Sequence, residues 1–228
     1  MRALRKAILL SCFLVVSLYG IGFAHRLLEI DGVRQTVDDA LRIEAPDVSQ
    51  VAYVTLPAGT EYWVVLDVVE PTSLSISLGV PVLERLAAYR PNVAVLGPGL
   101  GTTDLALAAG VSEEGLRIEY TVAEEPDVFS EPVTGTDSWI LLDTSIDLPE
   151  AQRYYIVVWS DADVGGKAWV ALGDRDVFGV MDVVLLPAII RNVREFHEAS
   201  SQISHEAMGS LVFLFLCALL VNWAIARS

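Results

Sequence analysis

Short runs of apolar or alternating residues, separated by turn residues, follow one another through most of this 228-residue chain. The runs are QVAYVTL, EYWVVLDVV, SLSISLGV, NVAVLGPGL, LRIEYTVAEE, SWILLDTSIDL, RYYIVVWS and KAWVALGD. Between them stand PAGT, EPTS, EEPD and VTGT. Such a succession predicts a mainly β domain, an antiparallel jelly-roll-like β-sandwich, over residues 49–176. Residues 25–48 would form an N-terminal extension, and VLERLAAYR and TDLALAAGVSEEG would be helical or irregular interruptions.

Three stretches resemble the pre-peptidase C-terminal-like domain of secreted bacterial proteins. They are VAYVTLPAGTEYWVVLDVV, NVAVLGPGL and LPEAQRYYIVVWSDADVGGKAWVALGD. Where that family commonly has Gly-Thr before the paired aromatic residues, this chain has Gln152 and Arg153, and no peptidase domain accompanies the match. The resemblance implies a β-sandwich that acts as a binding, chaperoning or packing module without catalysis.

The first 24 residues have the pattern of a secretory signal. Arg2, Arg5 and Lys6 precede an apolar stretch that ends in small residues at Ala24. We expect cleavage after Ala24, with an uncleaved signal anchor as the alternative.

The other end carries an uncharged stretch, residues 208–226, which as a helix would be about 28 Å long. It is long enough to cross a bilayer. Trp223 suits the membrane interface, and Arg227 in the short tail 227–228 suits the cytoplasmic side. We therefore expect a single-pass membrane protein whose main domain lies in the periplasm or outside the cell.

The region between these ends is strongly acidic. All 30 acidic residues and eleven of the 15 basic residues lie there, which gives a net charge of −19. Bulk charge therefore argues against a nucleic-acid partner. Cys12 and Cys217 both fall in hydrophobic end segments, so no disulfide or thiol chemistry is expected in the outer domain.

A glycine-rich loop follows one predicted strand, with Gly97, Gly99 and Gly101 in VLGPGLGTTD. The spacing does not fit the dinucleotide fingerprint, and no Lys-Ser/Thr pair closes the glycines as in a nucleoside-triphosphate loop. We interpret the segment as a turn between strands that binds no nucleotide.

Residues 177–207 form a predicted amphipathic juxtamembrane segment. Its apolar residues recur at helical spacing, and Pro187 should start or kink the helix. The apolar face would lie on the sandwich, on lipid or on a partner. Because about thirty residues exceed what a tether requires, we expect a partner-binding face made of Ile189, Ile190, Val193 and Phe196.

The three histidines give little support for catalysis, and we expect no enzyme. None falls within the predicted sandwich, where a serine nucleophile would need one. His25, as a first mature residue, is a weak copper candidate that needs His197 or His205 to complete the site. The segment HEASSQISHE lacks the second histidine of the H-E-x-x-H zinc motif, since Ser201 stands there.

Two further patterns suggest ligands. Asp161 and Asp163 in DADVGG are weak calcium candidates, although the segment is foremost a hairpin turn whose glycine pair would supply positive φ. Four tryptophans are either packed in the sheets or form a sugar-stacking platform, namely Trp63, Trp139, Trp159 and Trp169.

The sequence thus predicts a membrane-anchored extracytoplasmic sandwich that binds another envelope or membrane protein as an accessory subunit. A carbohydrate- or calcium-binding surface module is the alternative, and an envelope hydrolase or metal enzyme is a third hypothesis. Apart from calcium, no cofactor is expected. The lipid bilayer is the second partner, contacted by residues 208–226.

Overall fold

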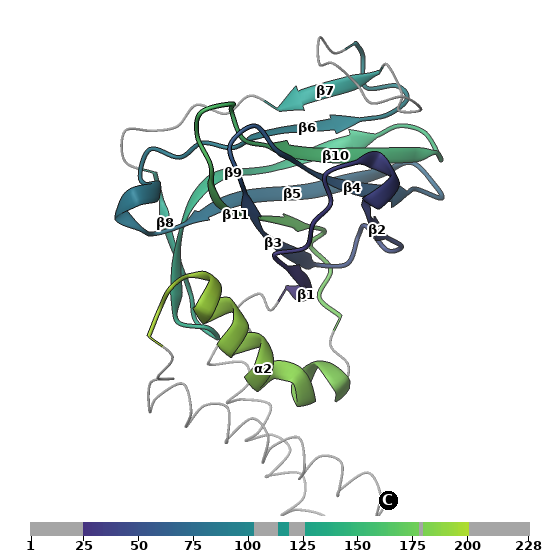
Figure 1. Ribbon diagram of the computed structural model, residues 1–228. Helices are drawn as coiled ribbons and strands as arrows, with labels where there is room; N and C mark the ends of the chain where they lie inside the picture. Colours follow the sequence, from purple (N-terminus) through teal and green to yellow (C-terminus); the bar gives the residue numbers. More distant parts are fainter. Residues whose placement is uncertain (1–24, 103–113, 119–125, 178–179, 201–228) are drawn as a thin grey trace, which may run out of the picture.

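The computed structural model describes residues 25–102, 114–118, 126–177 and 180–200, which form two packed β-sheets and one helix (Figure 1). The six-stranded sheet has the order β1 (Arg26–Ile30), β3 (Gln50–Leu56), β11 (Gly166–Leu172), β5 (Thr72–Pro81), β9 (Thr136–Leu148) and β8 (Val128–Glu131). The five-stranded sheet has the order β2 (Leu41–Ile43), β4 (Glu61–Asp67), β10 (Arg153–Trp159), β6 (Asn92–Leu96) and β7 (Gly115–Ile118). Two short 3₁₀ helices, η1 (Val37–Asp39) and η2 (Glu84–Leu86), and helix α2 (Val180–Phe196) complete the described fold.

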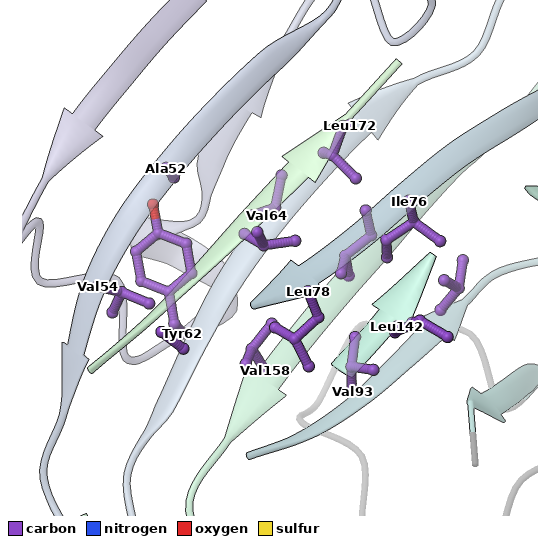
Figure 2. Packing of buried hydrophobic residues seen from close by; sticks show 14 of the residues in the cluster. Ala52, Val54, Tyr62, Val64, Ile76, Leu78, Val93, Leu142, Val158 and Leu172 are labelled. Carbon is purple, nitrogen blue, oxygen red and sulfur yellow. The ribbon is translucent and has the colours of Figure 1, made fainter. Parts of the chain in front are cut away.

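The core lies between the sheets and follows from alternation along the strands. In β5 the inward residues Leu74, Ile76, Leu78 and Val80 are all buried. They meet residues of the other sheet such as Val158 of β10 (Figure 2). The described residues therefore form a β-sandwich in which each sheet contributes one apolar face to a shared core.

All eight strands expected from the sequence are present, as β3 to β7 and β9 to β11. The prediction for residues 25–48 differs from the structure, because this segment is part of the sandwich. β1 pairs with β3, and β2 pairs with β4, both in parallel, so the sheets are not purely antiparallel. β8 was not expected either. These three strands are only three to five residues long, too short for a periodic pattern to stand out.

The segments that were expected to be helical have different outcomes in the structure. In VLERLAAYR the structure has the single 3₁₀ turn η2, whereas residues 103–113 of the second segment lie outside the described residues. α2 confirms a helix in the amphipathic segment, and Pro187 lies inside it. Among the described residues, no helix is long and apolar enough to cross a membrane. The hydrophobic ends, residues 1–24 and 208–226, lie outside the described residues.

Candidate functional site

The outer face of the six-stranded sheet is apolar across β1, β3, β11 and β9, with β5 between the last two strands. Val51, Trp169 and Ala171 are buried there, and Leu27, Tyr53 and Ile140 pack against them. A sheet face that meets water normally carries polar residues. This face is covered instead by the end of α2, where Ile190, Val193 and Phe196 are also buried.

We call this contact the helix joint. Its sheet side is formed by Tyr53, Ser138, Lys167 and Trp169, and its helix side by Phe196, His197 and Glu198. The Phe196 ring meets the Tyr53 ring edge-on, with centroids 5.2 Å apart, and Lys167 Nζ lies 5.1 Å from the Phe196 centroid. Phe196 is only 3% exposed. Aromatic contacts of this geometry add to the stabilisation that apolar burial provides.

His197 is the buried polar centre of the joint. Its Nδ1 donates to the carbonyl oxygen of Val193 at 2.9 Å, which leaves Nε2 as the acceptor. Ser138 Oγ lies 3.1 Å from Nε2 and donates to it, while Trp169 Nε1 donates to Ser138 Oγ at 3.0 Å. Both ring nitrogens of the neutral imidazole are therefore satisfied. Burial lowers the pKa of His197, and nearby Lys167 lowers it further.

The Ser138–His197 pair was not expected from the sequence, because 59 residues separate its members. A serine beside a histidine is a nucleophile and a base in hydrolases. Here both side chains are buried, and Nδ1 faces a backbone carbonyl instead of a carboxylate. The pair therefore holds the helix on the sheet and offers a substrate no access.

The chain leaves α2 through a turn that is fixed to the sheet. Ala199 N donates to Arg194 O at 2.9 Å and Glu198 N donates to Glu195 O at 3.0 Å, the two bonds of a Schellman motif. Glu198 therefore occupies the left-handed position, with φ of 55°, where glycine is usual. A non-glycine residue in this conformation costs about 1 kcal/mol.

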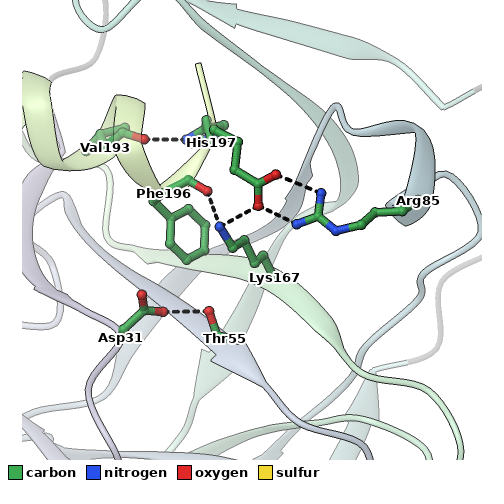
Figure 3. Close-up of polar contacts among 8 residues, drawn as sticks. Asp31, Thr55, Arg85, Lys167, Val193, Phe196 and His197 are labelled. Atoms are coloured by element: carbon green, nitrogen blue, oxygen red, sulfur yellow. Dashed lines mark hydrogen bonds and ion pairs between the residues drawn. The ribbon is translucent and has the colours of Figure 1, made fainter. Parts of the chain in front are cut away.

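Two cations from the sandwich bind this carboxylate (Figure 3). Lys167 Nζ lies 2.9 Å from Glu198 Oε1 and also donates to the Phe196 carbonyl oxygen at 2.8 Å. The Arg85 guanidinium contacts both carboxylate oxygens. These contacts lower the pKa of Glu198, Lys167 having the larger effect. Since Glu198 is exposed, we regard the ion pairs as orienting contacts.

Arg194 joins the same region to the β8–β9 turn. Its guanidinium donates to the carbonyl oxygens of Thr134 at 2.7 Å and Ser200 at 2.6 Å. The Arg194 side chain therefore links Ser200, which follows the helix, to the sandwich.

The joint corrects the expectation of a partner-binding face. Ile190, Val193 and Phe196 are buried, Phe196 against Tyr53 of the chain's own sheet, and Ile189 is half-buried. The apolar spacing revealed the buried face of the helix, but spacing alone does not say what covers that face. The cover is provided by apolar outer residues of β1, β3, β11 and β9, which come onto one face only in the folded sheet.

The copper candidate His25 lies at the start of β1, where its Nδ1 is 2.5 Å from Ser49 Oγ. Burial lowers the pKa of His25. His197 is engaged through both nitrogens in the joint, so it does not complete a site with His25, and His205 lies outside the described residues. Within the described ranges, no group of three or more His, Cys, Asp or Glu side chains is placed to hold a metal ion.

The calcium candidates lie in the exposed turn between β10 and β11. Asp161 Oδ1 accepts from Asn92 Nδ2 at 3.0 Å, and the Asp161 carbonyl oxygen accepts from Gly59 N at 2.8 Å. Asp163 is exposed. The structure does not bring the two carboxylates together with a third acidic side chain.

Neither glycine of the pair in this turn, Gly165 and Gly166, has positive φ, contrary to expectation. Gly165 is needed for close approach, because a Cβ there would lie 2.8 Å from Ala58 N.

The four tryptophans lie in three different places in the sandwich. Trp63 and Trp159 belong to the outer cluster of the five-stranded sheet, where Trp63 meets Tyr155 edge-on at 6.4 Å. Trp139 packs against the central core, and Trp169 lies in the helix joint. The structure therefore places them as packing residues and does not gather all four on one platform.

The glycine-rich loop is the turn that the sequence predicted, and its backbone is used by the chain itself. Gly97 N donates to the Glu114 carbonyl oxygen at 2.9 Å, and Gly99 N donates to the Glu114 carboxylate. Gly99 and Gly101 have φ of 75° and 88°, which explains the glycines. The anion at this loop is thus a side chain of the same protein.

Comparison with known proteins identifies no family. No protein-family model matches the sequence, and a search of curated proteins finds no match.

Solved structures share the fold only weakly. The pre-peptidase C-terminal domain of a Bacillus anthracis collagenase is 10% identical with a TM-score of 0.35, covering 62% of this chain and 99% of that one. PliG, a periplasmic inhibitor of g-type lysozyme from Aeromonas hydrophila, is 14% identical with a TM-score of 0.31, covering 66% and 98%. A surface-associated copper-binding protein of Methylomicrobium album is 10% identical with a TM-score of 0.28, covering 67% and 100%. The domain that the sequence resembles is thus also among the structural neighbours.

Phe196→Asp should destabilise the folded protein, because it places a carboxylate in a buried aromatic contact. We expect the free energy of unfolding to fall by roughly 3 kcal/mol or more. Asn192→Asp introduces the same charge at an exposed position of the same helix. It should change the free energy of unfolding by less than about 0.5 kcal/mol. Thermal and urea unfolding of the full chain in detergent measures both. Equal stability of the two variants would contradict the burial of Phe196 in the joint.

Protonation of His197 should weaken the fold at mildly acidic pH. Since its pKa is lowered in the folded state from an ordinary value of 6.5, the unfolded chain takes up the proton first. The stabilisation is complete above pH 6.5 and is lost as pH falls below that value, by at most about 1.4 kcal/mol per pH unit. Unfolding free energies measured from pH 8 to pH 5 should therefore decline less steeply in His197→Gln than in wild type. The pKa of His25 is lowered as well, so His25→Gln is the control that measures the contribution of this second histidine. If the unfolding free energies of wild type and His197→Gln declined equally with pH, His197 would not be the source of the pH dependence.

Proposed function

We propose that this protein is a membrane-anchored, extracytoplasmic β-sandwich that binds another protein as an accessory subunit of an envelope or membrane complex. Residues 208–226 would anchor it in the bilayer with a single span, and the sandwich would lie in the periplasm or outside the cell. In this role it is not an enzyme and needs no cofactor.

The observation that carries the proposal is the helix joint. The uncharged segment begins at Met208, eight residues after Ser200, which Arg194 holds against the sandwich. Eight residues span at most about 28 Å even when fully extended. A sandwich fixed to its own juxtamembrane helix would therefore stay close to the bilayer and have little freedom to turn. This arrangement suits a module that presents one particular surface to a membrane neighbour.

A surface suited to protein binding lies at the edge of the six-stranded sheet. β8 is the last strand in the sheet order and pairs with β9 on one side. Val128 and Phe129 of this strand are exposed, which is unusual for large apolar side chains at an edge. Backbone edges of this kind accept a strand from another protein, and apolar side chains add specificity. The four tryptophans do not share one surface, so protein binding is better supported than sugar stacking.

The topology can be tested with a reporter that is active only in the cytoplasm. Fused after Ser228 it should be active, and fused after Gly173 it should be inactive. The basic residues flanking both hydrophobic ends are the physical reason, because such residues stay on the cytoplasmic side. Activity of the Gly173 fusion would contradict an extracytoplasmic sandwich.

Protein binding at β8 can be tested by photo-crosslinking in intact cells. A photoreactive amino acid at Phe129 should give one discrete adduct larger than the 24.8 kDa chain. Val69 is the control, since it is an apolar side chain, 88% exposed, outside the edge strand. The absence of an adduct from position 129, or the same adducts from both positions, would contradict a binding edge at β8.

A further inference from the structure

The outward side of α2 changes character along its length. Near its start, Val184 and Leu185 are 59% and 48% exposed, and Pro187 is exposed beside them. One to two turns later the exposed residues are polar, namely Arg191, Asn192 and Glu195. The apolar surface is thus confined to the first half of the helix.

These exposed side chains are not part of the helix joint. The joint lies at the second half of the helix, where Ile190, Val193 and Phe196 are buried. Val184 lies on one line with residues 188, 191 and 195, on the other side of the helix from Val193. Leu185 lies on the same side as Phe196 but three turns before it, where it is exposed. α2 therefore has a second apolar surface that the chain's own sheet does not cover. Val177, just before the helix, is 45% exposed as well.

We propose that this surface, formed by Val184, Leu185 and Pro187, rests on the membrane at the boundary between lipid headgroups and acyl chains. The inference rests on the proposed function, because it needs the segment 208–226 to be in the bilayer. The chain between Ser200 and Met208 reaches no farther than about 28 Å, and α2 itself is about 26 Å long. The bilayer surface is therefore within reach of the whole helix.

The arrangement of charge fits a helix that lies on lipid. Arg191 follows Val184 by two turns on the same side, where a guanidinium can meet headgroup phosphates while the apolar side chains enter the interface. α2 lies on the side of the sandwich far from β6 and β7 (Figure 1). With α2 on the membrane, those strands would face away from it. The joint would then set the tilt of the sandwich, since the helix would contact the sheet with its second half and the lipid with its first half.

Spin labels on the full chain in vesicles test the proposal. Cys12→Ser and Cys217→Ser provide a background without cysteine, and Leu185→Cys or Glu195→Cys provides the single site. The vesicles contain phosphatidylcholine and phosphatidylglycerol. Collision with oxygen, which concentrates in lipid, is compared with collision with a water-soluble nickel chelate. We expect the oxygen-to-nickel ratio to be at least threefold higher at position 185 than at position 195.

Three other outcomes would overturn the inference, and each has a separate meaning. Equal ratios at both positions would place Leu185 in water. Low collision rates with both reagents at position 185 would mean that a protein covers it. Release of the chain from the vesicles by alkaline carbonate would refute the membrane anchor, and with it both proposals. Retention of the chain with Leu185 in water would refute only the lipid contact of α2.

Discussion

The burial of Phe196 against Tyr53, with His197 bonded to Ser138 beside it, is the contact on which the account of this protein depends. The outer face of the six-stranded sheet is apolar, and the end of α2 is what covers it. The same contact fixes the direction in which the chain leaves the sandwich. The contact that covers the sheet face is therefore also the contact that places the end of α2.

Polar groups make the joint specific as well as stable. Lys167 contacts the Phe196 ring and its carbonyl oxygen, and it reaches Glu198 beyond the helix end. Each polar contact requires one register of the helix on the sheet, whereas apolar burial alone would tolerate small shifts. The left-handed conformation of Glu198 contributes to this specificity, because it turns the carboxylate towards Arg85 and Lys167.

Alternation of apolar and polar residues was enough to predict eight strands and the sandwich, because core strands such as β5 bury every second residue. It did not reveal β1 and β2. Both strands are short, and each pairs in parallel with a later strand, β1 with β3 and β2 with β4. The candidate site was harder to predict. The helical spacing of Val193 and Phe196 showed that one face would be buried, but the partner of that face, including Trp169 and Ser138, is created by strand order. Pairings of that kind, such as His197 with Ser138, leave no local pattern in the sequence.

The central claim, that α2 is clamped to the sandwich, is tested most directly by hydrogen exchange of the full chain. The amides of His197 and Ala199 donate within the helix end and its turn. If the joint holds, a peptide covering residues 190–199 should exchange nearly as slowly as one from β10, at the centre of its sheet. Exchange of residues 190–199 at the rate of an exposed helix, while β10 stays protected, would contradict the account.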